Sequence, residues 1–218
     1  KYAPDESLSL FQFQKPRVAK KLYFDVIPKA VDEYLTFLEK YPEEAPERQI
    51  ENPVWHIHSG KPPAETTPVS FALLLNLVAV ANPEDRSQLW GFISQYAPEA
   101  SPETHPLLDQ LAGYAMSYYR DFILPQKTYR APTDAERAAM EDLSARLKAF
   151  DGERTSENLQ TLTFSVGKDH EFENLREWFK ALYEVLLGQS QGPRFGSFAA
   201  LYGVENTARL IDESLARG

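Results

Sequence analysis

The residues with the clearest chemical potential lie in the segment 177–198, EWFKALYEVLLGQSQGPRFGSF. An aromatic helical pattern ends there at Gly188, and a short loop leads to a helix introduced by Pro193, with Arg194 and Phe195 at its start. A helix N-terminus carries unpaired amides and a positive dipole, so an adjacent arginine and exposed rings can hold a phosphate or stack on an unpaired base. We therefore expect a binding patch around Arg194.

Core packing is the alternative explanation for the rings of this segment. Helical spacing alone would bury most of them. Core packing is therefore the favoured interpretation for any single ring. Arg194 is a better candidate for the surface, because burying an unpaired arginine is costly. The rings concerned are Trp178, Phe179, Tyr183, Phe198 and Tyr202.

A second segment, residues 7–25, interleaves basic side chains with rings. Cations beside rings suit a nucleic-acid backbone. An ordinary solvated helix face explains the pattern equally well. The cations are Lys15, Arg17, Lys20 and Lys21, and the rings are Phe11, Phe13, Tyr23 and Phe24.

Signatures of catalysis are missing from the sequence. It has no phosphate-binding glycine loop, no zinc-protease motif and no nucleophile elbow. His56 and His58 are two residues apart, but no third ligand stands at a recognisable spacing, and isolated His105 and His170 are read as plain polar residues. We predict neither a catalytic residue nor a metal site in this chain.

The charge distribution leaves room for a polyanionic partner. The 218 residues carry a net charge of −9, which disfavours phosphate contacts overall. Residues 41–118 hold ten acidic against three basic side chains, whereas residues 1–40 and 119–204 are close to neutral. A polyanion can therefore dock outside the central stretch.

Cellular location is suggested by what the composition lacks. The chain has no cysteine, which fits a reducing cytosol. Its longest apolar run, residues 71–81, is too short for the roughly 18–20 residues that cross a bilayer. The sequence starts without methionine or a signal peptide, so we expect a cytoplasmic protein of which this chain is a part.

Residues that start or end helices recur throughout the chain, and they predict an all-α fold. Asn82, Ser101 and Thr133 are read as N-caps, the last with Glu136 in a capping box, and Gly188 and Gly203 as C-terminal caps. Residues 161–166 alternate like a strand, but their neighbours favour a helix. Helices are predicted near 69–81, 84–96, 102–124, 134–149, 156–167, 172–187, 194–202 and 205–216.

The N-terminal part has a helical stripe and a boundary. Apolar residues at three- and four-residue spacing over 18–40 predict a helix that Pro28 breaks or kinks. Residues 42–68 contain six prolines, and we interpret them as a linker or long connection.

Six stretches together carry a family pattern: residues 2–8 (YAPDESL), 15–17 (KPR) with 19–20 (AK), 52–58 (NPVWHIH), 68–71 (PVSF), 118–122 (YYRDF) and 192–198 (GPRFGSF). In this combination the chain resembles the C-terminal part of a class I lysyl-tRNA synthetase, over nearly its whole length. The family's HIGH-like and KMSKS-like motifs, which lie in an N-terminal Rossmann-type catalytic domain, do not occur here. HIHSG at residues 56–60 only superficially echoes the first motif.

The resemblance implies a division of the chain and a role. Residues 1–60 would be a small helical stem-contact region, and residues 65–218 an α-helix cage that binds the anticodon. The partners would be tRNA(Lys) and the enzyme's own catalytic domain, with no membrane and no DNA. The parent enzyme would be a lysine–tRNA ligase that uses ATP and Mg²⁺, while this chain alone would hold no cofactor and would be inactive.

Candidate RNA-binding residues follow from the two basic and aromatic segments. Lys15, Arg17, Lys20 and Lys21 would neutralise stem phosphates, and Lys168, Arg176, Lys180 and Arg194 would line the anticodon side, with Phe195, Phe198 or Tyr202 as a stacking face. Two rivals remain open: a helical protein-interaction module without an RNA role, which the acidic centre favours, and a stand-alone enzyme with His and carboxylates in a cleft.

Overall fold

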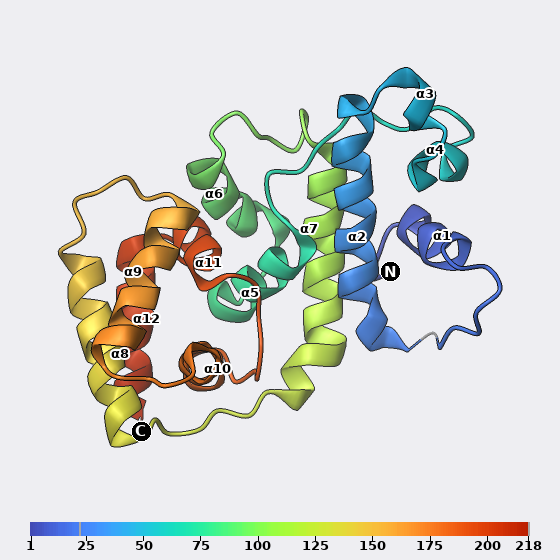
Figure 1. Cartoon of the computed structure of the whole chain (residues 1–218). Helices are drawn as coiled ribbons and strands as arrows, with labels where there is room; N and C mark the ends of the chain where they lie inside the picture. Colours follow the sequence, from blue (N-terminus) through green and yellow to red (C-terminus); the bar gives the residue numbers. More distant parts are fainter. Residues whose placement is uncertain (22, 218) are drawn as a thin grey trace.

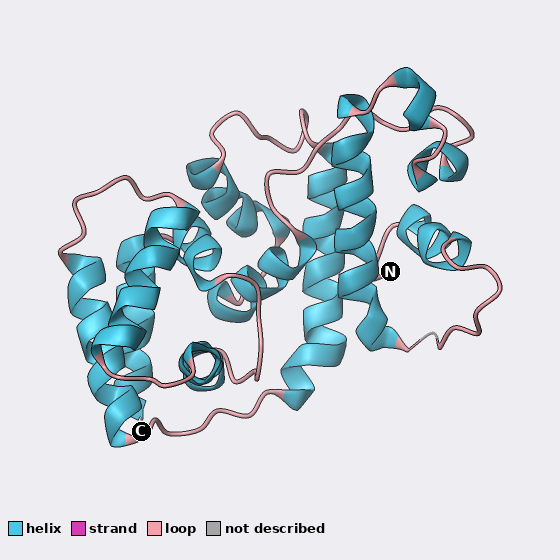
Figure 2. Ribbon diagram, viewed as in Figure 1, coloured by secondary structure: helices cyan, strands magenta, loops and turns pink. Residues whose placement is uncertain are grey.

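The computed structural model describes residues 1–21 and 23–217, and in that part of the chain the regular structure is entirely helical (Figures 1 and 2). The predicted all-α fold is confirmed. The helices are α1 (Asp5–Phe13), α2 (Ile27–Lys40), α3 (Pro46–Gln49), α4 (Pro53–Ile57), α5 (Phe71–Ala81), α6 (Arg86–Tyr96), α7 (Pro106–Tyr118), α8 (Asp134–Lys148), α9 (Ser156–Asp169), α10 (Leu175–Leu186), α11 (Phe195–Tyr202) and α12 (Val204–Arg217).

Every helix predicted from residue 69 onward is present. The residues that cap the helix N-termini agree with the sequence prediction at some helices and differ at others. The capping box is confirmed, because Glu136 N donates to Thr133 Oγ1 and Thr133 N donates to Glu136 Oε2. Residues 161–166 lie within α9.

Two of the predicted N-caps are wrong. Asn82 has a φ of 42° and ends α5 in a left-handed conformation, while Asp85 caps α6 by accepting a hydrogen bond from Gln88 N at 3.2 Å. Ser101 instead pairs with Thr104 in a turn, and α7 begins at Pro106, where a proline loses no helical hydrogen bond.

The N-terminal stripe forms a shorter helix than predicted. Pro28 stands in the first turn of α2 and therefore starts this helix instead of breaking it. Val18 lies outside any helix and is 59% exposed, whereas Val31, Tyr34 and Leu38 further along are buried.

The proline-rich stretch folds onto the N-terminal part. It contains the short helices α3 and α4, and α4 packs against α1 and α2. Tyr34 on α2 is hydrogen-bonded to His58 at 2.9 Å. Residues 61–67 then run without regular structure toward α5, so the predicted boundary between residues 1–60 and 65–218 falls in this run and stays a prediction.

One continuous apolar core joins the two parts, from Leu10 to Leu215. In Figure 1, α1, α3 and α4 lie on one side of α2 and α7, and α8–α12 lie on the other. Among the C-terminal helices, α9 packs against α11 and α8 against α12. Asp212 on α12 accepts hydrogen bonds from Ser144 and Lys148 on α8, which fixes this second pair at the surface.

Candidate nucleic-acid interface

The turn that carries Arg194 is held by close packing around two glycines. A Cβ on Gly192 would lie 2.2 Å from a ring carbon of Tyr183, and a Cβ on Gly196 would lie 2.2 Å from the carbonyl oxygen of Ser156. The Tyr183 hydroxyl donates to the carbonyl of Pro193, and Gly196 N donates to Gln160 Oε1 at 2.8 Å. Only glycine allows this approach, so the turn has one defined path.

Arg194 occupies the N-cap position of α11 and is exposed. Its guanidinium forms no ion pair or hydrogen bond with any described residue of the chain. The cation therefore stands in solvent beside the positive end of a helix, where it is available to an anionic partner.

The rings of Phe195 and Phe198 do not accompany Arg194 to the surface. They are 1% and 0% exposed, and their centroids lie 5.7 Å apart inside the core. The predicted stacking face is wrong for these two residues, because their three-residue spacing places both on the buried side of α11. Tyr202 is half-buried and stacks on Phe198 and on Phe92, each with centroids 5.5 Å apart.

The remaining cations predicted on the anticodon side are exposed but spread along two helices. Lys168 is near the end of α9, about 12 Å along the axis from Gln160, the residue that contacts the start of α11. Arg176 stands in the first turn of α10. Lys180, one turn further, lies 3.7 Å from Glu184. The structure thus brings Lys180 to a carboxylate and leaves Lys168 and Arg176 in solvent.

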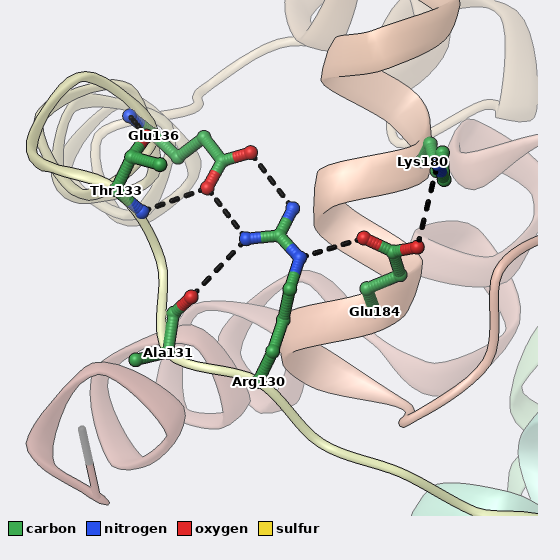
Figure 3. Close-up of polar contacts among 6 residues, drawn as sticks. All are labelled: Arg130, Ala131, Thr133, Glu136, Lys180 and Glu184. Carbon is green, nitrogen blue, oxygen red and sulfur yellow. Dashed lines mark hydrogen bonds and ion pairs between the residues drawn. The ribbon is translucent and has the colours of Figure 1, made fainter.

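Glu184 belongs to a network centred on Arg130, which the sequence did not single out (Figure 3). Arg130 donates to Glu184 at 2.6 Å and binds both carboxylate oxygens of Glu136, at 2.7 and 2.8 Å. These carboxylates raise the pKa of Arg130 and Arg130 lowers the pKa of Glu136, so both stay charged. Because its donors are occupied, Arg130 joins α8 to α10 and is not a free cation.

The N-terminal cations lie in the loop after α1, on the opposite side of α2 and α7 from α9–α11 (Figure 1). Lys15, Arg17 and Lys21 are exposed, and their side chains have no ion-pair partner in the described part of the chain. Lys20 is different. It is half-buried, and its Nζ donates to the carbonyls of Phe11, Gln12 and Gln14 at the C-terminus of α1.

Two hollows adjoin the N-terminal loop. One of about 500 Å³ is lined by Lys15 and Lys20 and also by Lys29, a cation that the sequence analysis missed. The other, of about 730 Å³, lies between residues 23–25 and the loop 188–191. Tyr23 and Phe24 at its edge are 64% and 55% exposed. Both rings belong to the basic and aromatic segment 7–25 that the sequence analysis singled out.

The histidines make structural contacts. His56 binds the carbonyl of Ile50 at 2.8 Å and stacks on Phe13, and His170 lies 3.0 Å from Asp142. Across residues 1–21 and 23–217, no three His, Asp or Glu side chains are grouped so that they could hold a metal ion. Within the same residues, no helix has the length and apolar character needed to cross a membrane.

Comparison with known proteins gives these features a context. The sequence model of a family described as tRNA synthetases class I (K) matches residues 1–61. A protein named lysine–tRNA ligase from Roseobacter denitrificans is 55% identical over 99% of this chain and 41% of its own length. Proteins of the same name from Rickettsia felis and Rickettsia bellii are 48% and 49% identical over 99% of the chain.

The chain spans about two fifths of the length of these relatives. The family match at its N-terminal part and the identity along its whole length agree with each other and confirm the resemblance found from the sequence motifs. The chain is thus similar, over nearly its whole length, to a segment of the class I lysyl-tRNA synthetases.

Proposed function

We propose that this chain is the tRNA-recognition part of a lysine–tRNA ligase, with residues 1–60 contacting the tRNA stem and residues 65–218 the anticodon. A catalytic domain outside the chain would attach lysine to tRNA(Lys) in the cytoplasm. The observation that carries this proposal is the 55% identity, over 99% of the chain, to a protein named lysine–tRNA ligase.

The exposed cations support a contact with RNA. On the stem side, Lys15, Arg17 and Lys21 are exposed in one loop, without an ion-pair partner among the described residues, and would neutralise backbone phosphates. On the anticodon side, Arg194 at the start of α11 is the best-placed cation, with Lys168, Arg176 and Lys180 on neighbouring helices.

The two sets of cations lie on opposite sides of α2 and α7, which fits a ligand that contacts more than one side of the chain. Helices α2, α5 and α7 lie between the loop after α1 and the α9–α11 group (Figure 1). A tRNA held at both places would be fixed in orientation as well as in position. Binding energy gained at these sites would then orient the acceptor end over a distant active site.

ATP and Mg²⁺ belong to the chemistry that the resemblance implies for the whole enzyme. The described residues do not fit a metal, because they contain no group of three His, Asp or Glu side chains suited to one. We expect this chain to form no lysyl-adenylate by itself, because the HIGH-like and KMSKS-like motifs of the family do not occur in it.

A titration of the chain with tRNA across a salt series tests the proposal. If Lys15, Arg17, Lys21 and Arg194 contact phosphates, the logarithm of the association constant should fall steeply and linearly with the logarithm of salt concentration. Absence of binding at low salt, together with binding to a protein partner, would favour the helical interaction module instead.

A further inference from the structure

The hollow of about 730 Å³ has one wall from the N-terminal part of the chain and one from the part that follows residue 65. Residues 23–25 form the first wall, where Phe24 stacks on Phe122 with ring centroids 4.5 Å apart. The loop 188–191 and residues 126–130 form the second wall, joined by a hydrogen bond from Thr128 N to the carbonyl of Gly188 at 3.1 Å. None of the cations proposed above to contact RNA lines this hollow.

Its electrostatics disfavour a phosphate. Lys127 donates to the carbonyl of Ala79 and to the Tyr119 hydroxyl, and Arg130 is held by Glu136 and Glu184, so both cations of the lining already have partners. Asp25 adds a carboxylate to the same lining. An anion in the hollow would find both cations already bonded to other groups and would be repelled by the Asp25 carboxylate. A neutral group would not be repelled.

Flat faces and amide groups suit a neutral heterocycle. Tyr23 is 64% exposed and has no aromatic neighbour among the described residues, whereas Phe24 already uses one face on Phe122. Three glutamines, Gln126, Gln189 and Gln191, are among the residues that line the hollow. Base-to-ring stacking together with carboxamide hydrogen bonds is how proteins bind unpaired bases.

Gln189 supplies an independent observation. Its side-chain Nε2 is buried and has no hydrogen-bond partner in the described part of the structure. A buried donor without an acceptor costs free energy, and native structures seldom leave one unpaired. This nitrogen has almost no accessible surface, so a carbonyl oxygen on the edge of a base would reach it only after the Gln189 carboxamide turns toward the hollow.

We propose that this hollow binds one unpaired base of RNA, with Tyr23 stacking on the base and the Gln189 carboxamide hydrogen-bonded to its edge. The inference rests on the proposed function and adds the location and chemistry of a base-binding site. Because Tyr23 belongs to the predicted stem-contact region and Gln189 to the predicted cage, a bound base would contact both at once.

Variants of the chain test the proposal by tRNA titration at fixed salt. Tyr23→Ala should weaken binding by about five- to 150-fold, the range for removing one stacked ring. Tyr23→Phe should retain most of the affinity, because it keeps the ring. Gln189→Leu should also weaken binding while leaving the fold intact. Phe164→Ala is the matched control, since Phe164 is 38% exposed on α9 and does not line the hollow.

Crosslinking locates the base directly. With tRNA that carries thiouridine at unpaired positions, one nucleotide should crosslink to the peptide around Tyr23 and to the peptide around Gln189. Circular dichroism of each variant shows whether it is folded. For a variant that does not fold, the crosslinks of the unaltered chain decide.

The outcomes separate the two proposals. If the chain binds tRNA with a steep salt dependence, but Tyr23→Ala binds equally well and no crosslink falls in the hollow, the base site is wrong and the proposed function stands. If the chain binds no tRNA, both are wrong. If a free nucleoside binds as tightly as the tRNA and competes with it, the hollow takes a small ligand and the assignment to RNA is wrong.

Discussion

The carboxylate of Asp32 on α2 accepts hydrogen bonds from the backbone amides of Phe71 and Ala72, at 2.6 and 3.1 Å, and so caps the N-terminus of α5. Glu65 does the same for α7, accepting from Leu107 N at 2.7 Å. Both carboxylates come from segments distant in sequence from the helices that they cap. The Asp32 contacts fix α2 against the start of α5, and the Glu65 contact fixes the connection before α5 against the start of α7.

Removing the Asp32 cap should destabilise the whole fold. Asp32→Ala leaves two amides at the start of α5 without an acceptor, and we expect the free energy of unfolding to fall by about 1–2 kcal/mol. Urea unfolding followed by circular dichroism measures this change. Asp151→Ala, at an exposed aspartate without a hydrogen-bond partner in the described part of the chain, is the control and should change stability little. Equal stability of the two variants would contradict the capping role.

Arg194→Ala should weaken tRNA binding without unfolding the chain. The side chain is exposed and has no ion-pair partner among the described residues, so its loss should cost about 1–3 kcal/mol of binding free energy if it contacts a base. Fluorescence titration at fixed salt measures the loss. Arg48→Ala changes another exposed arginine, on α3 in the acidic stretch, and should leave affinity nearly unchanged. Similar affinities for both variants would remove Arg194 from the interface.

The predicted phosphate cations should divide into two groups. Lys21→Ala should lower the salt slope of tRNA binding by about one unit, because one phosphate contact is lost. Lys20→Ala should instead release the C-terminus of α1, because its ammonium binds three carbonyls there. Amide hydrogen exchange in residues 5–13 distinguishes these effects. If Lys20→Ala left amide exchange unchanged and reduced the salt slope of tRNA binding, Lys20 would be a phosphate contact and not a cap of α1.

Local signals predicted the helices, and distant contacts explain what the sequence analysis missed. The Thr133 capping box involves residues three apart, and such a pattern is visible in a sequence. The cap of α5 by Asp32 and the hollow between Tyr23 and Gln189 depend on the tertiary fold. Phe195 was proposed for stacking because it adjoins Arg194. The helix turns neighbouring side chains to different faces, so the arginine is exposed and the ring is buried.

Acid should weaken the attachment of the first residues to the π-helical segment Tyr119–Ile123. Lys1, Arg120 and Tyr2 donate to Asp121 and lower its pKa to about 2. Because this folded-state pKa is below the ordinary value of 3.8, the contribution to stability is complete above about pH 4 and is lost as pH falls toward 2. Acid unfolding should therefore be shifted in this window by Asp121→Asn. A superimposable acid transition in the variant would contradict this role.

Two glycine-to-alanine substitutions should change stability in opposite directions. In Gly196→Ala the new Cβ would meet the carbonyl of Ser156 at 2.2 Å and the backbone nitrogen of Gln160 at 2.4 Å, and backbone atoms cannot move aside as a flexible side chain can. We expect a loss of about 1–3 kcal/mol and a displaced start of α11. Gly91 lies inside α6 with nothing within 4 Å of an added Cβ, so Gly91→Ala should stabilise by about 0.5–1 kcal/mol. Thermal unfolding measures both changes. If Gly196→Ala were as stable as the unaltered chain, the path of the 192–196 turn would have to differ from the one described, and the exposure of Arg194 would lose its structural basis.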